Sequence, residues 1–88
     1  MKAIITVVGK DKTGIVAGVS AKIAELGLNI DDNSQTVLDY FFTMMAVVSS
    51  DEKQDFTYLR SEFEAYGETL NVKINIQSEA IFDAMYNI

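Results

Sequence analysis

Two short groups of residues in this chain have the types and spacing of a small-molecule site. The first is Asp11-Lys12-Thr13-Gly14, which follows a β-rich segment and precedes a helical pattern that begins at Ile15. Such a turn leads into a helix N-terminus, where unpaired backbone N–H groups and the helix dipole favour a small anion. The second group, Gly27-Leu28-Asn29-Ile30, closes the helix with glycine and opens a new strand with a polar residue. Together they indicate recognition of a small molecule, not catalysis.

The composition excludes several other classes of function. The 88 residues include no cysteine and no histidine. Disulfides, thiolate nucleophiles and zinc fingers are therefore excluded, and the usual general base and metal ligand at neutral pH is missing. The net charge is −6 and Arg60 is the single arginine. This balance argues against nucleic acid and anionic lipid as partners, because phosphate binding rests on clustered Lys and Arg.

The length predicts one domain, because 88 residues bury a modest core but not two. No apolar run approaches the roughly 20 residues of a membrane-spanning helix. The apolar N-terminal segment is interrupted by Thr6 and ended by Gly9, which does not match a secretory signal peptide. We therefore expect a buried strand there and a cytoplasmic protein.

The hydrophobic periodicity predicts alternating strands and helices. In chain order they are a strand over 3–9, a helix after 13, strands over 28–38 and 41–49 joined at 39–40, a helix from 51 to 67, a strand over 69–77 and a short terminal helix. Thr13 is the expected N-cap of the first helix and Gly27 its C′ residue. Asp51 with Gln54 has the spacing of a capping box, and Ser78 is the expected cap of the terminal helix.

The chain reads as two similar strand–helix–strand halves. The compact arrangement is an α+β, ferredoxin-like βαββαβ fold, with both main helices on one face of a four-stranded antiparallel sheet in the order 4-1-3-2. Gly18 is expected to let the first helix pack closely on this sheet. Segment 41–48 is apolar on both faces, although an uncovered sheet face is normally polar. The terminal segment 81–88, a second subunit, or neither could cover it.

Three familiar motifs are incomplete in this sequence. Gly9 to Gly14 has P-loop glycine spacing, but Ile15-Val16 stands where lysine and Ser/Thr are needed. Gly14 and Gly18 do not make a dinucleotide fingerprint. Asp31-Asp32-Asn33 resembles the start of a calcium loop without its glycine and final glutamate, so it offers at most a weak divalent-ion site. We predict no cofactor and no metal.

Residues 4–77 resemble the ACT domain family, most closely its short stand-alone members and more distantly the glycine-cleavage-repressor-like proteins. The similarity is carried by Val7 to Val16 and by Gly27-Leu28-Asn29-Ile30. The family commonly has proline directly before the glycine, where this chain has Thr13. The resemblance implies a ferredoxin-like fold, side-by-side dimers and amino-acid ligands between subunits.

The two groups cannot easily meet within one chain. The first follows the end of strand one, and the second starts a strand that runs parallel to it, so they lie at opposite ends of the sheet. A two-fold axis along the polar edge strand 28–38 would bring the first group of one chain towards the second group of the other chain. The predicted ligand site therefore joins two subunits, with backbone amides near Thr13 to Ile15 binding a carboxylate, and Asn29, with Asp31 or Asp11, binding an ammonium group. Its full set is Asp11, Lys12, Thr13, Gly14 and Ile15 from one chain and Asn29, Ile30 and Asp31 from the other.

Other interpretations of the same residues stay open. In a purely structural one, Asp11 only fixes the turn and Gly14 only fits a crowded first helical turn. In another, the chain is an interaction module that dimerises, or docks on an enzyme or regulator, and binds no metabolite. Catalysis of the acylphosphatase kind needs an arginine in the loop after the first strand, and this chain has none there. We therefore predict a regulatory protein that is not an enzyme.

Overall fold

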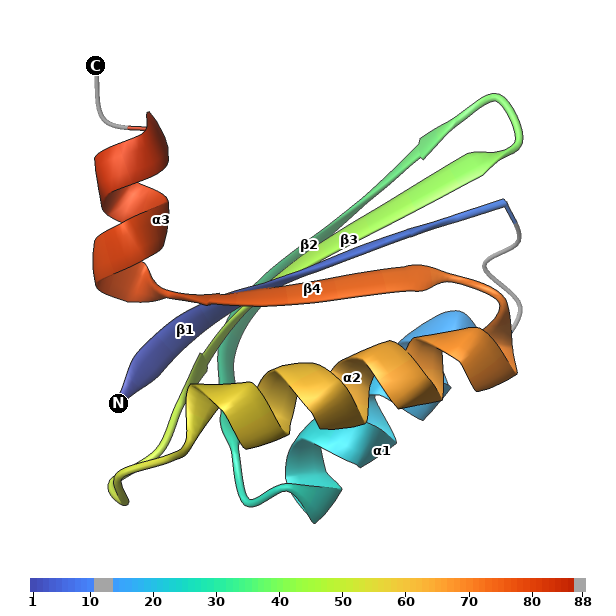
Figure 1. The fold of residues 1–88 in the computed structure, drawn as a ribbon. Helices are drawn as coiled ribbons and strands as arrows, with labels where there is room; N and C mark the ends of the chain where they lie inside the picture. Colours follow the sequence, from blue (N-terminus) through green and yellow to red (C-terminus); the bar gives the residue numbers. More distant parts are fainter. Residues whose placement is uncertain (11–13, 87–88) are drawn as a thin grey trace.

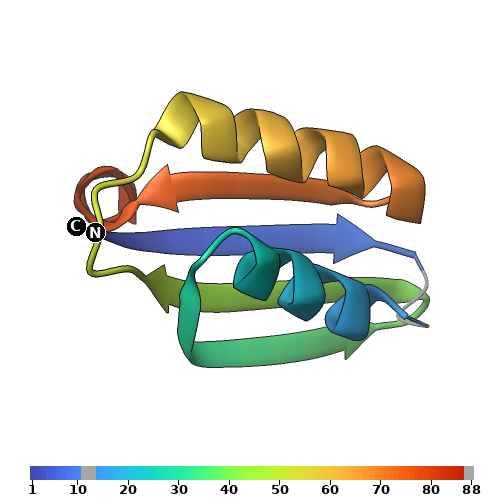
Figure 2. The same ribbon diagram turned by 90° about the horizontal axis from the view of Figure 1, so that it is seen from below.

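The computed structural model describes residues 1–10 and 14–86. The elements in chain order are β1 (Lys2–Gly9), α1 (Ile15–Glu25), β2 (Asn29–Leu38), β3 (Phe41–Ser49), α2 (Phe56–Leu70), β4 (Lys73–Ser78) and α3 (Glu79–Tyr86). The strands form one antiparallel sheet in the order β2-β3-β1-β4. Helices α1 and α2 cover one face, and α3 rises from the other (Figures 1 and 2). The predicted ferredoxin-like fold and strand order are confirmed.

The hydrophobic core lies between the sheet and the helices α1 and α2. Alternate residues of each central strand point into it, since successive strand side chains face opposite sides. The helices contribute a stripe at three- and four-residue spacing. The fully enclosed larger side chains are Ile5, Val7, Val19, Ile23, Phe42, Met44, Val48, Leu59, Phe63 and Ile76.

Helix α1 ends as the sequence predicts but begins differently. Gly27 has φ 78°, its N–H donates to Ala24 O at 3.0 Å, and the N–H of Leu28 donates to Ile23 O at 3.1 Å. These two bonds make a Schellman motif, so the C′ role of Gly27 is confirmed. The N-cap position is Gly14, with φ 76° and no side-chain cap, whereas Thr13, the expected cap, lies outside the described residues.

Helix α2 starts and ends later than the sequence predicts. Its N-cap is Asp55, whose side chain accepts from the N–H groups of Thr57 at 2.9 Å and Tyr58 at 3.5 Å. The predicted capping box at Asp51 and Gln54 is wrong, because the Gln54 amide instead donates to Ser50 Oγ at 3.4 Å. A carboxylate that accepts two N–H groups of the first turn is the better cap.

The C-terminal end of α2 also corrects the predicted strand over 69–77. The helix continues past Gly67 to Leu70 and ends at Asn71 in the left-handed conformation, with φ 56°. Strand β4 therefore begins only at Lys73. Gly67 is buried inside the helix, and a Cβ there would lie 2.7 Å from Val72 O. Its role is close packing against the chain that turns back into β4, not helix termination.

Gly18 allows two helices, not a helix and the sheet, to approach each other. A Cβ at this position of α1 would lie 2.8 Å from Tyr66 Oη and 3.2 Å from Leu70 Cδ1, both on α2. The predicted helix–sheet contact at Gly18 is therefore replaced by a helix–helix contact. The expected cap of the terminal helix is confirmed, since Ser78 Oγ accepts from the N–H of Ile81 at 3.2 Å.

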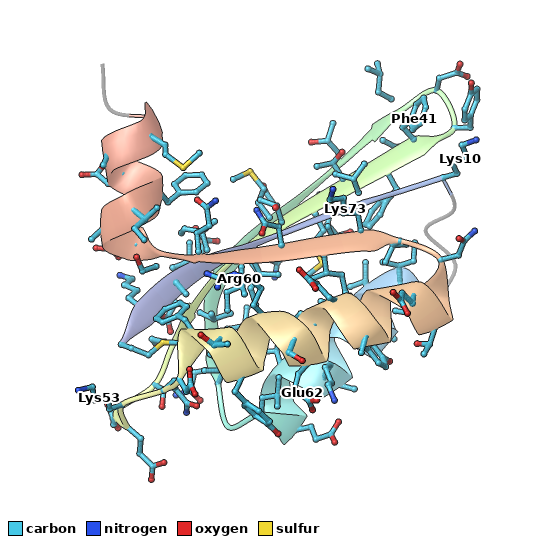
Figure 3. All side chains as sticks on the ribbon, in the orientation of Figure 1. Lys10, Phe41, Lys53, Arg60, Glu62 and Lys73 are labelled. Atoms are coloured by element: carbon cyan, nitrogen blue, oxygen red, sulfur yellow. The ribbon has the colours of Figure 1, made fainter. Side chains whose placement is uncertain are left out.

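Lys22 links α1 to α2 through a partly buried cluster of charges. Its Nζ lies 3.2 Å from Glu62 Oε1, 3.6 Å from Glu25 Oε2 and 5.7 Å from the centre of the Tyr66 ring. Glu62 is labelled on α2 in Figure 3. The hydrogen bond to Glu62, followed by the charges of both glutamates and opposed by burial, raises the pKa of Lys22 above 10.5.

We expect Lys22 to make part of the stability depend on alkaline pH. A raised folded-state pKa means that its contribution is fully present below the unfolded pKa and is lost as the pH rises through the folded pKa. The thermal midpoint should therefore fall as the pH passes about 10.5, and fall less in Lys22→Met. Thermal unfolding followed by circular dichroism measures this, with the exposed Lys53→Met as the matched control. Equal pH dependence of the Lys22 variant and native protein would contradict it.

Candidate functional site

The first predicted group lies where β1 leads into α1. Asp11, Lys12 and Thr13 lie outside the described residues, so the structure places only Gly14 and Ile15. Gly14 carries the left-handed backbone of the cap, and a Cβ there would meet nothing within 4 Å. Ile15 is 3% exposed and belongs to the core. The side chain of Ile15 thus anchors the helix start, and only its backbone N–H can face a ligand.

The second predicted group opens the edge strand β2. Asn29 and Ile30 are paired with Ser49 and Val48 of β3, and the register shifts between Ile30 and Asp32. At this bulge the Asp31 carboxylate accepts a hydrogen bond from Ser49 Oγ at 2.9 Å. Asp31 is therefore held by its own chain, whereas the exposed Asn29 is the better-placed polar group of the two for a ligand.

The structure does not bring the two groups together within one chain. Asn29 pairs with Ser49, which pairs with Lys2 at the start of β1, whereas the turn to α1 follows Gly9 at the other end. The seven residue steps from Lys2 to Gly9 span about 23 Å at the usual strand rise. A single ligand of amino-acid size cannot contact both groups of one subunit.

Strand β2 is exposed along its whole length. It pairs only with β3, so its outer edge carries backbone groups without a strand partner among the described residues. All its residues are exposed, including Ile30 at 37% and Val37 at 57%, which face the same side of the sheet as the core residues opposite them. The edge of β2 is not covered by the described residues of its own chain, and its helix-side face is covered only in part.

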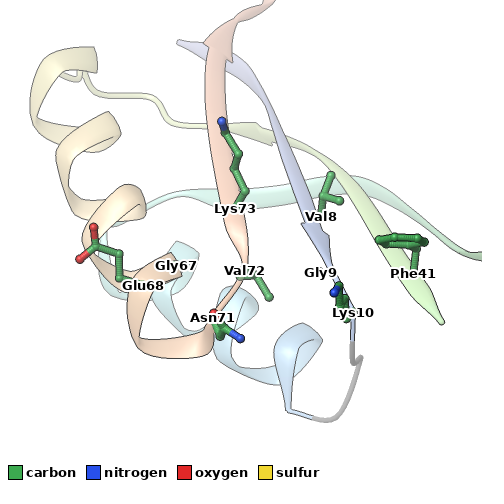
Figure 4. A pocket seen from close by; sticks show the side chains of 9 residues that line it. All are labelled: Val8, Gly9, Lys10, Phe41, Gly67, Glu68, Asn71, Val72 and Lys73. Atoms are coloured by element: carbon green, nitrogen blue, oxygen red, sulfur yellow. The ribbon is translucent and has the colours of Figure 1, made fainter.

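A separate hollow of the described surface lies at the end of the sheet where β1 ends. It encloses about 540 Å³ between the end of β1, the start of β4 and the end of α2 (Figure 4). Its polar groups are Lys10, Glu68, Asn71 and Lys73, and its apolar walls are formed by Val8, Phe41 and Val72, with Gly9 and Gly67. The pocket lining thus holds two ammonium groups and one carboxylate beside apolar walls.

Sequence reasoning missed this pocket because its residues come from separate parts of the chain. Lys73 appeared only as one polar residue of an alternating strand, and Asn71 was placed inside that strand. The pocket opens on the β4 side of β1, whereas the exposed edge belongs to β2. Gly9 and Lys10 line the pocket and lead directly into the predicted turn, so the two candidate places adjoin there.

Metal binding and membrane insertion receive no support from the described part of the chain. Among residues 1–10 and 14–86, no three acidic side chains lie close enough together to hold a metal ion. Asp31 and Asp32, the start of the calcium-like sequence, are not part of such a group. None of the described helices combines the length and apolar character needed to cross a bilayer.

Comparison with known proteins agrees with the fold. The model of the family described as ACT domain matches residues 2–77. A UPF0237 protein from Streptococcus pneumoniae is 89% identical over 88 residues, covering the whole of both chains. A solved structure of an ACT domain protein from Streptococcus pneumoniae is 88% identical, covers 98% of each chain and has a TM-score of 0.90.

A more distant solved structure shares the fold alone. The structure of a putative glycine cleavage system transcriptional repressor is 22% identical, covers 86% of this chain and 44% of that one, and has a TM-score of 0.75. The family model spans most of the sequence, and the strand order is the one the sequence predicts. The chain therefore belongs to the ACT domain family.

Proposed function

We propose that this protein is a cytoplasmic regulatory domain that binds an amino acid at a seam between the β2 strands of two copies. The observation that carries the proposal is the exposure of β2 on its edge and on its helix-side face. An exposed edge is a template for pairing with another strand. Membership of the ACT family supports a ligand-binding regulatory role and the absence of catalysis.

Antiparallel pairing of two β2 strands would bring the two groups of the predicted site together. In that arrangement the Asn29 end of one strand lies beside the Leu38 end of the other. Leu38 pairs with Phe41, and the neighbouring Phe42 pairs with Gly9, so this is the end at which β1 leads into the turn. Each of two equivalent sites would then combine the turn of one chain with the start of β2 of its partner.

The groups at this seam suit the two charged ends of an amino acid. The first N–H groups of α1 have no intrahelical acceptor and favour a carboxylate. Gly14 leaves open space beside them because a Cβ there would contact nothing. The exposed Asn29 of the partner would accept from the ammonium group through its side-chain oxygen. Asp31, held by Ser49, would act by its charge and by fixing the bulge next to Asn29.

Isothermal titration with single amino acids tests the ligand. Asn29→Ala should weaken binding of the amino acid that binds by about 1–3 kcal/mol, the usual cost of leaving a buried polar group without its partner. The matched control is Asn71→Gly, which removes an asparagine from the 540 Å³ pocket while keeping the left-handed backbone of that position. Weaker binding in Asn71→Gly together with native binding in Asn29→Ala would indicate that the amino acid binds in the 540 Å³ pocket and not at the seam.

A mixed dimer tests whether the site needs two chains. With Gly14→Val in one subunit and Asn29→Ala in the other, one site carries both defects and the second site is intact. With both substitutions in one subunit, each site carries one defect. Because Gly14 has φ 76°, valine also strains the backbone, so circular dichroism must first show that the variant folds. Equal weakening of all sites in the divided arrangement would contradict the seam.

The alternative function is an interaction module that dimerises or docks on a metabolic enzyme or regulator without a ligand. The exposed β2 edge favours this alternative equally, because strand pairing requires no metabolite. A protein that dimerises through β2 but binds no amino acid in the titrations would support it.

A further inference from the structure

The face of the sheet opposite α1 and α2 carries apolar side chains that a solvent-facing sheet normally lacks. In β1 and β3 the residues between the core positions point to this open face, and the register places Ile4 beside Val47 and Thr6 beside Met45. Val8 is 47% exposed and Met45 36%. One-sided antiparallel sheets usually present polar residues to water, so the part of this face formed by β1 and β3 has the character of a contact surface. β4 presents the polar residues Lys73, Asn75 and Gln77 to the same face.

Helix α3 stands at one end of the open face instead of lying over it. Figure 1 shows α3 on this side of the sheet, and Figure 2, which looks at the sheet face-on, shows α3 nearly end-on. Ile81 and Met85, four residues apart on one side of the helix, are 54% and 56% exposed. An eight-residue helix is about 12 Å long, close to the roughly 10 Å that separates two sheets packed face to face.

A groove of about 250 Å³ lies on the open face beside α3. Its apolar lining comes from Ile4, Met45 and Val47 of the sheet and Phe82 of α3, and Asp32 to Ser34 form its rim. At the other end of the same face, the β2–β3 hairpin presents Leu38 at 74% and Phe41 at 44% exposure. The face thus has an apolar hollow at one end and apolar projections at the other.

Charge is also divided between the two ends. α3 carries exposed Glu79 and Asp83, and Glu79 lies 3.7 Å from Lys2. At the far end Lys73 is paired with Val8 and extends on the open side of the sheet, and Lys10 follows the end of β1 (Figure 3). Five residue steps from Lys73 to Ser78 separate these ends by about 17 Å. Asp83 and Lys73 of one chain therefore cannot meet.

A second copy of the chain would complement three features of the open face: the upright helix α3, the groove with the apolar hairpin end, and the charges at the two ends. A two-fold axis that lies between the two sheets, parallel to their planes and perpendicular to the strands, stacks two open faces with their strand directions reversed. Each α3 then stands over the Lys73 end of its partner, and each hairpin end lies over its partner's groove. Asp83 of α3 meets the Lys73 end of the partner, whereas Glu79 is paired with Lys2 of its own chain. The helix height fits the spacing between the sheets.

The surface available is sufficient for such a contact. Four strands at about 4.8 Å spacing and about 23 Å length give roughly 450 Å² per face. The two faces contribute about 900 Å² before α3 and the hairpin ends are added, and specific interfaces begin at about 1,000–1,200 Å². We propose that two copies of this chain pair through their open sheet faces, with α3 of each docked against the Val8–Lys73 end of the other. This interface is separate from the β2 seam.

Charge exchange between α3 and the Lys73 end tests the proposal. We expect Lys73→Glu and Asp83→Lys each to weaken association about tenfold or more, because each places like charges together at two equivalent contacts. Sedimentation velocity on the full chain measures the loss. Lys53→Glu and Glu52→Lys, both exposed in the loop before α2, are matched controls that should associate like the native protein.

Mixing the two variants gives the decisive result. In a pair formed by one Lys73→Glu chain and one Asp83→Lys chain, both contacts join opposite charges, so association should return to the native level. The Lys73→Glu/Asp83→Lys double variant should recover in the same way. Recovery requires contact between chains, because the two positions lie too far apart within one chain.

The two interfaces give separable outcomes. A native protein that uses both should sediment as a tetramer, and Lys73→Glu should reduce it to a dimer. If only the open face is used, the native dimer should become a monomer. Single variants that associate like the native protein, a native monomer at micromolar concentration, or failure of the mixture to recover would overturn the proposal. Circular dichroism confirms that each variant is folded.

Discussion

Phe63→Ala should lower the free energy of unfolding by about 3–5 kcal/mol, the usual range for removing a phenylalanine from a packed core. Phe63 is fully buried and is among the largest enclosed side chains. It lies on α2, which packs against the sheet, so the cavity would open inside the core between them. For a domain of this size each kcal/mol is worth about 4–8 °C, so the thermal midpoint should fall by more than about 10 °C.

The control for this prediction is Tyr58→Ala on the same helix. Tyr58 is 54% exposed, and surface substitutions usually change stability by no more than about 0.5 kcal/mol. Chemical denaturation of both variants separates loss of core packing from a general effect on α2. Similar losses in the two variants would show that Phe63 does not hold the helix on the sheet as described.

Gly67→Ala should destabilise the protein by about 1–3 kcal/mol, although alanine is worth about 1 kcal/mol more than glycine in a helix. The added Cβ would lie 2.7 Å from the carbonyl oxygen of Val72. This oxygen belongs to the backbone, and the N–H of Val72 donates to Gly67 O at 2.9 Å, which holds the two segments together. The clash can be relieved only by moving the end of α2 away from β4.

Gly18→Ala is the matched control, because it also adds a Cβ to a glycine inside a helix. That Cβ would lie 2.8 Å from Tyr66 Oη, the end of a side chain that can rotate away. We expect its stability to change by less than about 1 kcal/mol in either direction, since the propensity gain offsets the adjustment. Thermal unfolding of the two variants distinguishes a rigid backbone contact from a flexible one. A Gly67→Ala protein as stable as Gly18→Ala would contradict the prediction.

Structural features that depend on a few neighbouring residues were predicted correctly. Apolar, β-rich segments bounded by turn residues identified β1 and β3, and the glycine after α1 and the serine before α3 marked their helix ends correctly. These signals act over a few residues, so the chain carries them whatever surrounds it. The order of strands and helices, combined with the handedness of crossovers, was sufficient to predict the sheet order.

The predictions that failed concern residues whose local pattern fits two structures. Segment 69–72 alternates like a strand, yet the helix continues to Leu70, because Gly67 lets α2 pack against the returning chain. Asp51 and Gln54 have capping-box spacing, but the carboxylate of Asp55 caps the helix. In both cases a contact with a more distant segment, or a competing local bond, decides between alternatives of similar local energy.

The same distinction between local and long-range effects applies to the candidate site. By itself the sequence determined the fold, the glycine turn into α1, the polar start of β2 and the position of these two groups at opposite ends of the sheet. Only the tertiary structure decided that Asp31 is held by Ser49, that a pocket opens beside Lys73, and that α3 rises from one end of the open sheet face. The physical reason is range: periodicity and turn chemistry depend on neighbours in sequence, whereas bulges, pockets and exposed faces depend on which distant segments the fold brings together.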